Sequence, residues 1–432
     1  MTARFCYGHA LWLLLLLVGT PGAAAAADTA ALPDSLGLSG LIERALPEAL
    51  RLQATRAALD GGRAARELAR VQRLPGLGLD ASAGWVSQVQ EISLPGKTIQ
   101  FGDGSSADLA LGTSWTLYAG GTLKAGEAAA EAELQARGHD LASDSLGLLG
   151  ELRGVYIQGL TARVSVLTAQ NSLSRLERHL EDVRGARRAG LAGAEEELAV
   201  AGRVQQARQE LLQRQGELEQ LAFELGRLCG TPEHPIHPAG SLDASLLESR
   251  AIPESLPSER ALAARQQGAE ARVRQATGAA RPRVEARAGW HLGRPGVDPI
   301  RNDWMTYGTA GLSLHWPLLD HGRVRQQAAI NRADALRLQR SREELARQTS
   351  ARRIQANTLL ESAQQVHEAA AARTRIETER LALVEQRWTQ GLSSQQTWLD
   401  ASDDLVLAQQ QQALAAARVR LAEVRLLAAR GQ

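Results

Sequence analysis

The feature that most constrains this chain is a strand-to-helix junction that occurs twice, 201 residues apart. At the second copy, apolar and polar residues alternate up to Trp316, which is the period of a strand with one apolar and one polar face. Pro317 and Gly322 end that pattern, because proline removes a ladder hydrogen bond and glycine permits a tight turn. At the first copy, Trp115 matches Trp316 and Gly121 matches Gly322. The fixed spacing indicates a duplicated chain.

The start of the chain has the layout of a secretory signal over residues 1–27. Arg4 precedes an apolar core over 11–18, and small residues at 25–27 suit cleavage. An N-terminal anchor stays open as an alternative, although the apolar run is short for a membrane-spanning helix. Cys6 would leave with the signal, and Cys229 would then stand alone, so we predict no internal disulfide. No later apolar run has the length of a membrane helix, so entry into a membrane would require strands.

The composition favours long helices over a thick globular core. Aromatic residues make up only 3% of the 432 residues, and Ala, Leu, Arg, Gln and Glu dominate. With 49 basic and 48 acidic residues, the chain has no overall field that favours nucleic acid. It has no glycine-rich phosphate loop, and its histidines are scattered. We therefore predict neither an enzyme nor a cofactor, a catalytic site or a metal site.

The first repeat is predicted over 28–230. A helix over 36–73 leads to a β-hairpin over 77–117, in which two alternating runs flank a loop rich in glycine, proline and serine. A helical hairpin over 122–229 follows, and its glycines leave open either a break or close helix contacts. Its returning helix has apolar residues every seven positions, which predicts a coiled coil: Val204, Leu211, Leu218 and Leu225.

A connector over 231–257 is rich in proline, serine and histidine. Glu233, His234 and His237 leave a metal site open as an alternative there. A plain linker is the preferred interpretation, because prolines interrupt this segment.

The second repeat is predicted over 258–432. It has a helix, a β-hairpin over 284–316 and a helical hairpin over 323–430. Leu407, Leu414 and Leu421 recur every seven residues in its returning helix.

Four alternating strands per chain cannot close a transmembrane barrel, which needs at least about eight. Either the hairpins form a small soluble β-domain or several chains pool their strands. Strands of bilayer length and the export signal favour pooling. Four tryptophans lie toward the strand ends, as interfacial aromatic residues do: Trp85, Trp115, Trp290 and Trp316.

At this point the chain resembles the outer-membrane efflux (TolC-like) proteins over essentially its whole mature length. The stretch from Trp316 to Gly322 and the two turns, Arg188–Leu191 and Arg387–Leu392, carry the resemblance most specifically. The order of two β-hairpins and two helical hairpins is a further mark of that family.

The resemblance implies a mainly α fold with a β-barrel part. Three identical chains would form a twelve-stranded barrel in outer-membrane lipid, continued by an α-helical tunnel into the periplasm. It implies passive export through the exit duct of a tripartite efflux or type I secretion system, carrying small molecules, metal ions or polypeptides. A periplasmic adaptor and an inner-membrane pump would be its partners.

The resemblance also implies roles for the two helical turns. Gly190, Leu191, Gly391 and Leu392 match the periplasmic tips, which would contact the adaptor. The alternative is turn geometry alone, with glycine at positive φ and leucine capping the coil.

Asp400 matches one position of the aspartate ring that narrows this tip in the family. Three carboxylates near a threefold axis would attract cations and gate the aperture. The second acidic position of the family is Thr397 here, and Asp403 and Asp404 are candidate substitutes. An acidic helix start favoured by the helix dipole is the alternative, as it is for the glutamates at 195–197.

A periplasmic coiled-coil adaptor or scaffold is the competing function. An adaptor usually has one helical hairpin between compact β-domains. Two hairpins in register, with strands of membrane length, favour the channel.

Overall fold

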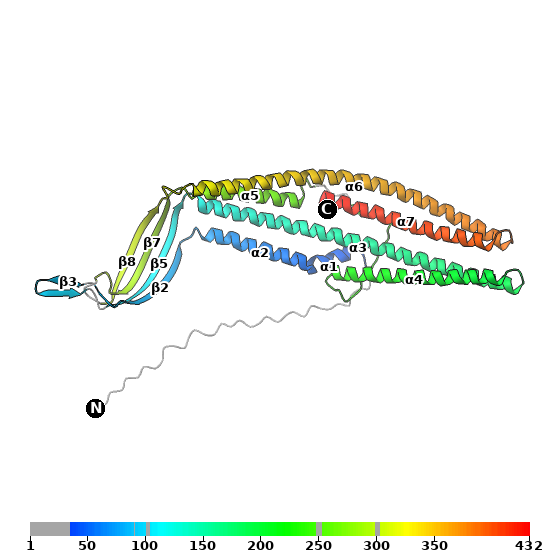
Figure 1. The fold of residues 1–432 in the computed structure, drawn as a ribbon, viewed down its shortest axis with the longest axis horizontal. Coiled ribbons are helices and arrows are strands. Elements are labelled where there is room, and N and C mark those ends of the chain that lie inside the picture. The colour runs from blue at the N-terminus through cyan, green and yellow to red at the C-terminus, as the bar shows by residue number, and fades with distance from the viewer. Residues whose placement is uncertain (1–34, 90, 101–103, 248–252, 299–302) are drawn as a thin grey trace, which may run out of the picture. The chain divides into compact units, whose positions relative to one another are not determined.

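The computed structural model describes residues 35–89, 91–100, 104–247, 253–298 and 303–432 (Figure 1). The predicted signal over 1–27 lies outside these ranges. Within them, no helix combines the length and the apolar character that a membrane crossing requires. As predicted, the chain is mainly helical and also carries β-strands.

Helices of the first repeat form around one very long helix. They are α1 (Leu38–Glu48), α2 (Leu50–Val71), α3 (Thr122–Arg188) and α4 (Ala194–Leu228). The predicted single helix over 36–73 is wrong, because Ala49 is extended, with ψ 111°, between α1 and α2. Pro47 lies inside α1, two residues before Ala49, and its missing N–H and its ring weaken the last turn of that helix. α3, in contrast, passes through its glycines without a break.

The second repeat has helices at matching positions. They are α5 (Pro257–Gly278), α6 (Arg323–Thr389) and α7 (Gln395–Arg430). α3 and α6 both have 67 residues, and each starts after a glycine in the left-handed region, with φ 88° at Gly121 and 81° at Gly322. The 201-residue spacing of the sequence is thus a spacing of helix starts.

The four long strands form one antiparallel sheet in the order β2-β5-β7-β8. They are β2 (Gly76–Trp85), β5 (Ser105–Ala119), β7 (Arg283–Arg294) and β8 (Met305–His315). The register places Leu79, Leu111 and Trp290 in one row across the sheet. The next row, on the opposite face, joins Asp80 to His291 and Tyr307 through Ala110. The sheet therefore has an apolar and a polar face.

Two short pairs of strands complete the fold. β3 (Glu91–Leu94) and β4 (Lys97–Gln100) form a small hairpin between β2 and β5, where the sequence indicated only a loop. β1 (Ser35–Leu36) pairs in parallel with β6 (His237–Pro238). The connector between the repeats is thus joined to the start of the described chain.

α3 is the central helix of the fold. It contacts α1, α2, α4, α5 and α7, whereas α6 contacts α5 and α7 (Figure 1). A core cluster around Leu152, Ile157 and Leu225 joins α1, α3, α4 and α7. This cluster lies near the middle of α3 and at the C-terminal end of α4.

The heptad leucines of α7 do not form the buried seam that their spacing predicted. Leu407 and Leu414 are 46% and 51% exposed. The buried residues of α7 around them are mainly alanines, including Ala408, Ala413 and Ala417. α7 packs against both α3 and α6, and small side chains allow the close approach that two neighbours require.

Candidate functional site

Each strand-to-helix junction is tied to the preceding short helix by a tryptophan. The indole Nε1 of Trp115 donates a hydrogen bond to the carbonyl of Arg73 at 2.9 Å. The indole Nε1 of Trp316 donates to the carbonyl of Ala280 at 3.2 Å. Both acceptors follow the end of a helix, α2 or α5, and precede a proline by two residues. The two predicted junction tryptophans therefore make the same bond in both repeats.

The second junction bends earlier than the first. Pro317 stands where the first repeat has Thr116, and β8 ends at His315 whereas β5 runs on to Ala119. The carboxylate of Asp320 accepts hydrogen bonds from the backbone N–H of Gly322 and Val324, at 2.9 and 3.0 Å. These two bonds hold the pKa of Asp320 below its usual value. Gly322 therefore lies in a turn that Asp320 caps, and Pro317 lies between the end of β8 and this turn.

The two helical turns have the same backbone geometry. Gly190 and Gly391 have φ of 77° and 72°. The N–H of Leu191 reaches back to Ala186 O and that of Leu392 to Arg387 O, both at 2.8 Å, which closes the end of each helix. Turn geometry therefore accounts for the two glycines.

The two leucines of these turns are not used for packing within the chain. Leu191 is 82% exposed and Leu392 is 73% exposed. The alternative in which they cap the coil does not describe these positions. They are free to contact another molecule, so their adaptor role stays a prediction.

The acidic residues of the first turn are engaged locally. Glu197 accepts hydrogen bonds from Arg187 and Arg184, at 2.5 and 3.1 Å, which lower its pKa. Glu196 accepts from the backbone N–H of Gly193 at 3.0 Å and closes the start of α4. These local contacts agree with the alternative in which the glutamates stabilise the start of a helix.

Asp400 differs from its two acidic neighbours on α7. Asp403 pairs with Arg203 of α4 at 3.1 Å, and Asp404 pairs with Arg380 of α6 at 2.6 Å. Asp400 is exposed and accepts a hydrogen bond from the neutral amide of Gln396 at 2.7 Å. Among the described residues, Asp400 is thus the one of these three carboxylates without a basic partner. Partial burial and the charges of Asp400 and Asp404 raise the pKa of Asp403 against the effect of Arg203.

Near the second turn lies a buried cluster that the sequence analysis missed. His179 of α3 is 3% exposed and stacks on Trp398 of α7, with ring centroids 3.6 Å apart. Trp388 of α6 meets the same imidazole edge-on at 4.6 Å. Two tryptophans ten residues apart, in a chain with 3% aromatic residues, were the available signal.

The connector between the repeats is bound to α3 through three successive carbonyl groups. Arg163 donates to Pro238 O at 2.9 Å and also to Gly240 O. The hydroxyl of Tyr156 donates to Ala239 O at 2.5 Å. Of the residues weighed as metal ligands, His234 is exposed and His237 lies 3.7 Å from Glu219.

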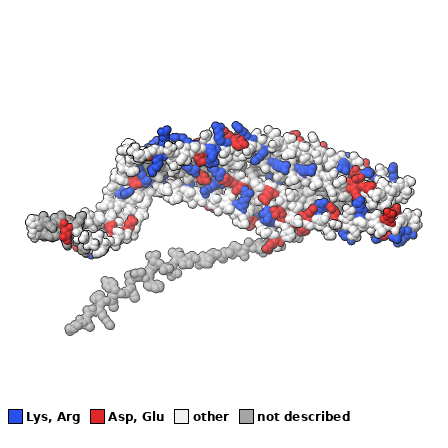
Figure 2. All heavy atoms as spheres, in the orientation of Figure 1, with Lys and Arg blue, Asp and Glu red and all other residues white. Residues whose placement is uncertain are grey.

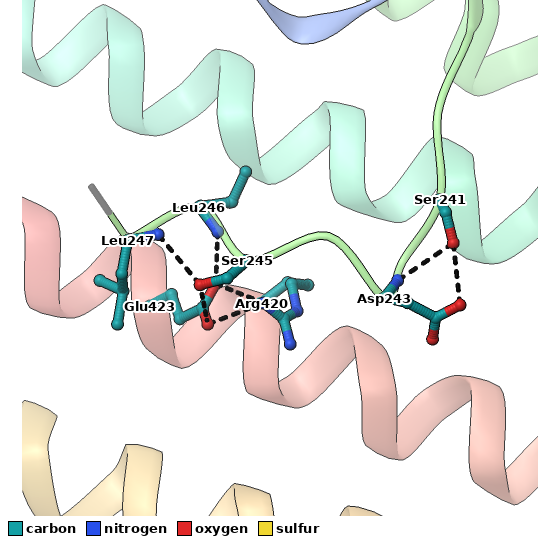
Figure 3. Close-up of polar contacts among 7 residues, drawn as sticks. All are labelled: Ser241, Asp243, Ser245, Leu246, Leu247, Arg420 and Glu423. Atoms are coloured by element: carbon teal, nitrogen blue, oxygen red, sulfur yellow. Dashed lines mark hydrogen bonds and ion pairs between the residues drawn. The ribbon is translucent and has the colours of Figure 1, made fainter. Parts of the chain in front are cut away.

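The same connector is bound to α7 by one buried carboxylate, shown in Figure 3. Glu423 is 3% exposed and accepts from Ser245 Oγ at 3.0 Å and from Leu246 N–H at 2.9 Å. Arg420 donates to it at 2.7 Å. The segment predicted as a plain linker is therefore held between α3 and α7.

Comparison with known proteins identifies the family. Residues 41–231 and 254–432 match the model of the outer membrane efflux proteins. The chain belongs to this family. It is accordingly an outer-membrane efflux duct and not an enzyme, with its helical part in the periplasm. The resemblance seen in the sequence is confirmed, and the competing adaptor function is set aside.

Solved structures share the fold. VceC of Vibrio cholerae has a TM-score of 0.76 and 20% identity, over 91% of this chain and 96% of that one. The MtrE channel of Neisseria gonorrhoeae has 0.75 and 20%, over 91% and 88%. CusC has 0.77 and 18%, over 93% and 95%. A search of curated proteins found no match.

Proposed function

We propose that three copies of this chain form one passive export duct, with a twelve-stranded barrel continued by a helical tunnel. This proposal rests on the four-stranded sheet, in which β2 and β8 each have one partner strand within the described part of the chain. Four strands cannot close on themselves, and an open edge is not tolerated in lipid. Pairing β8 of one copy with β2 of the next satisfies every edge.

The two faces of the sheet suit a barrel wall. On one face, Leu79 and Trp290 are 67% and 62% exposed, and on β8 Leu312 is 74% exposed. These side chains would face lipid. On the other face, His291 lies 3.1 Å from Asp108 and 3.2 Å from Thr309, and this polar row would line the lumen. Figure 2 shows fewer charged side chains over the sheet than over the helices on the face in view.

The helices also leave apolar surface for a second copy. On α6, Ile330, Ile354 and Ile376 are exposed by 62%, 67% and 62%. On α4, Leu198 and Leu212 are exposed by 71% and 65%. Packing of α6 from one copy against the first repeat of the next would remove these side chains from water, at about 25 cal/mol per Å² of apolar area.

The far end of the helical hairpins would meet the periplasmic adaptor. Leu191 and Leu392 are the exposed apolar residues of the two turns, and each is held outward by a left-handed glycine. An inner-membrane pump would supply both the energy and the choice of cargo. Three Asp400 carboxylates would narrow the aperture and favour cations over anions.

Matched charge substitutions on β5 test the barrel. Leu111→Asp places a charge on the apolar face, where a buried charge in lipid is costly. Ser114→Asp places the same charge on the polar face, opposite Arg287. We expect the first variant to lose the heat-modifiable trimer from outer-membrane fractions and the second to keep it. Equal retention of both trimers would contradict a lipid-facing sheet.

A further inference from the structure

The buried cluster around His179 connects the two helical hairpins of one chain. His179 comes from α3 in the first hairpin. Trp388, Trp398 and Gln395 come from the last turn of α6 and the start of α7 in the second. Apolar residues of all four helices enclose the site, including Leu180, Val200, Leu381 and Leu405. The cluster is thus an inter-hairpin contact close to the second turn.

The polar contact in this cluster depends on the protonation state of the histidine. The side-chain amide nitrogen of Gln395 lies 2.6 Å from Nε2 of His179. In this arrangement the amide donates and the ring nitrogen accepts, which requires an unprotonated Nε2. Once Nε2 carries a proton, the amide has to turn so that its oxygen accepts that proton; this contact then favours the protonated imidazole, and burial of the ring opposes it.

The closed cluster also leaves polar groups unpaired. Nε1 of Trp398 is buried and has no hydrogen-bond partner among the described residues. Nε and Nη2 of Arg175, one turn before His179 on α3, are in the same condition. Buried donors without partners weaken a contact, because water would satisfy them if it opened. These unpaired donors therefore lower the stability of the closed contact between the two hairpins.

We propose that His179, Trp388, Trp398 and Gln395 form a proton-responsive latch between the two hairpins, which opens when His179 gains a proton. The latch lies five residues before Asp400, counted from Gln395. Its link to the aperture rests on the proposed duct, whereas the latch itself is a property of one chain.

The charges around His179 set the direction of the response. Asp182 of α3 is the carboxylate that favours a proton on the imidazole. The carboxylates of the other helices are directed at arginines: Glu385 of α6 acts on Arg175, and Asp403 of α7 pairs with Arg203 of α4. The groups that α6 and α7 place against the ring, two indoles and an amide, are neutral.

Burial lowers the pKa of His179 below its ordinary value, ahead of the opposing effects of Gln395 and Asp182. An opened latch would return the ring to water, with a pKa of about 6.5. As the pH falls below that value, the open form binds the proton first, and the equilibrium shifts toward it until the closed-form pKa is reached. Each unit between the two pKa values changes the open-to-closed ratio by about tenfold.

The test measures the separation of the two turns within one chain. Leu191→Cys and Leu392→Cys, in a Cys229→Ala background, carry spin labels in purified trimers that contain a minority of labelled chains. We expect the distance between the labels to broaden and lengthen between about pH 7.5 and about pH 5, the range over which histidine titrates. His179→Phe should abolish this change, and His367→Phe, elsewhere on α6, should leave it intact.

Gln395→Glu should have the opposite effect and keep the latch closed at low pH. A carboxylate at this position would pair with the protonated imidazole, so the hairpins should stay together at about pH 5. The latch would be overturned if the distance between the labels in the wild type did not change with pH. It would also be overturned if that distance changed by the same amount in His179→Phe. Loss of trimers or of bilayer conductance with a normal distance response would count against the duct and leave the latch in place.

Discussion

α3 and α6 occupy equivalent positions in the two repeats but differ in how much of each helix is buried. Both have 67 residues, both follow a left-handed glycine, and both end at a leucine-tipped turn. Yet α3 has 19 buried residues and α6 has six. The duplication repeats the lengths and caps of the helices but not their neighbours.

The difference follows from which helices surround each twin. α3 lies against α1, α2, α4, α5 and α7, while α6 lies against α5 and α7 and meets α3 near the second turn through Trp388. One chain therefore completes the surroundings of its first long helix and leaves the second open. In our account, the open face of α6 is the place where the next copy packs.

The largest difference in stability is expected between alanine substitutions of a buried isoleucine on α3 and an exposed isoleucine on α6. Ile157 of α3 is 1% exposed, and Ile354 of α6 is 67% exposed. Ile157→Ala should destabilise the folded chain by about 2–5 kcal/mol through a cavity in the central cluster. Ile354→Ala should change folding by less than about 0.5 kcal/mol but lower the temperature at which trimers dissociate.

Denaturation followed by circular dichroism and trimer dissociation followed on gels separate the two effects. A large loss of folding stability from Ile354→Ala, with trimers intact, would mean that α6 is covered within its own chain.

Glu423 is a second point at which the repeats diverge, since Ala222 occupies the equivalent position. Glu423→Ala removes the acceptor for Ser245 and Leu246 and leaves Arg420, whose side chain is 14% exposed, without its partner. Losing one member of a buried pair costs about 3–5 kcal/mol. Limited proteolysis should then cut the connector near residue 245, whereas Glu379→Ala, at an exposed carboxylate of α6, should leave it resistant.

Much of the fold could be predicted from the sequence because it depends on local chemistry. The glycines at 121, 190, 322 and 391 determine where helices start and end, and alternating strands need only a period of two. The break at Ala49 was missed because Pro47 was assigned to the start of a helix and not to its end. The prediction of a leucine seam on α7 was wrong because the buried contacts of this helix are made mainly by alanines, which the heptad pattern does not count.

The candidate sites were harder to predict because they depend on partners far along the chain. Nothing near Glu423 in the sequence shows that Ser245 lies against it, 178 residues away. Likewise, His179 looks like an ordinary position of a polar helix until Trp398 stacks on it. Asp400, in contrast, was predicted from the family pattern, and its lack of a basic partner is visible only in the structure.

The junction tryptophans should behave alike, because both repeats make the same bond. Trp115→Phe and Trp316→Phe each remove one indole N–H and keep most of the ring. Each should lower the free energy of unfolding by about 0.5–1.5 kcal/mol, the usual contribution of one hydrogen bond. Thermal denaturation of the two variants measures this loss of free energy of unfolding. A large effect in only one variant would show that Trp115 and Trp316 have separate roles.

Asp400→Ala is expected to leave stability unchanged and to alter only ion flow. Removing three carboxylates should raise single-channel conductance or reduce block by divalent cations. Asp404→Ala is the matched control, because that carboxylate is already paired with Arg380. Identical recordings from wild type and Asp400→Ala would remove Asp400 from the aperture.

In the proposed trimer, β8 of one copy pairs with β2 of the next. Within one chain these strands are separated by β5 and β7, about 14 Å at the usual strand spacing, which is too far for a disulfide. Single cysteines along 77–84 combined with one at Gly311, in a Cys229→Ala background, would be oxidised in outer membranes. We predict covalent trimers for one register of pairs. Intact trimers with no cross-link at any pair would contradict the pairing of β8 with β2.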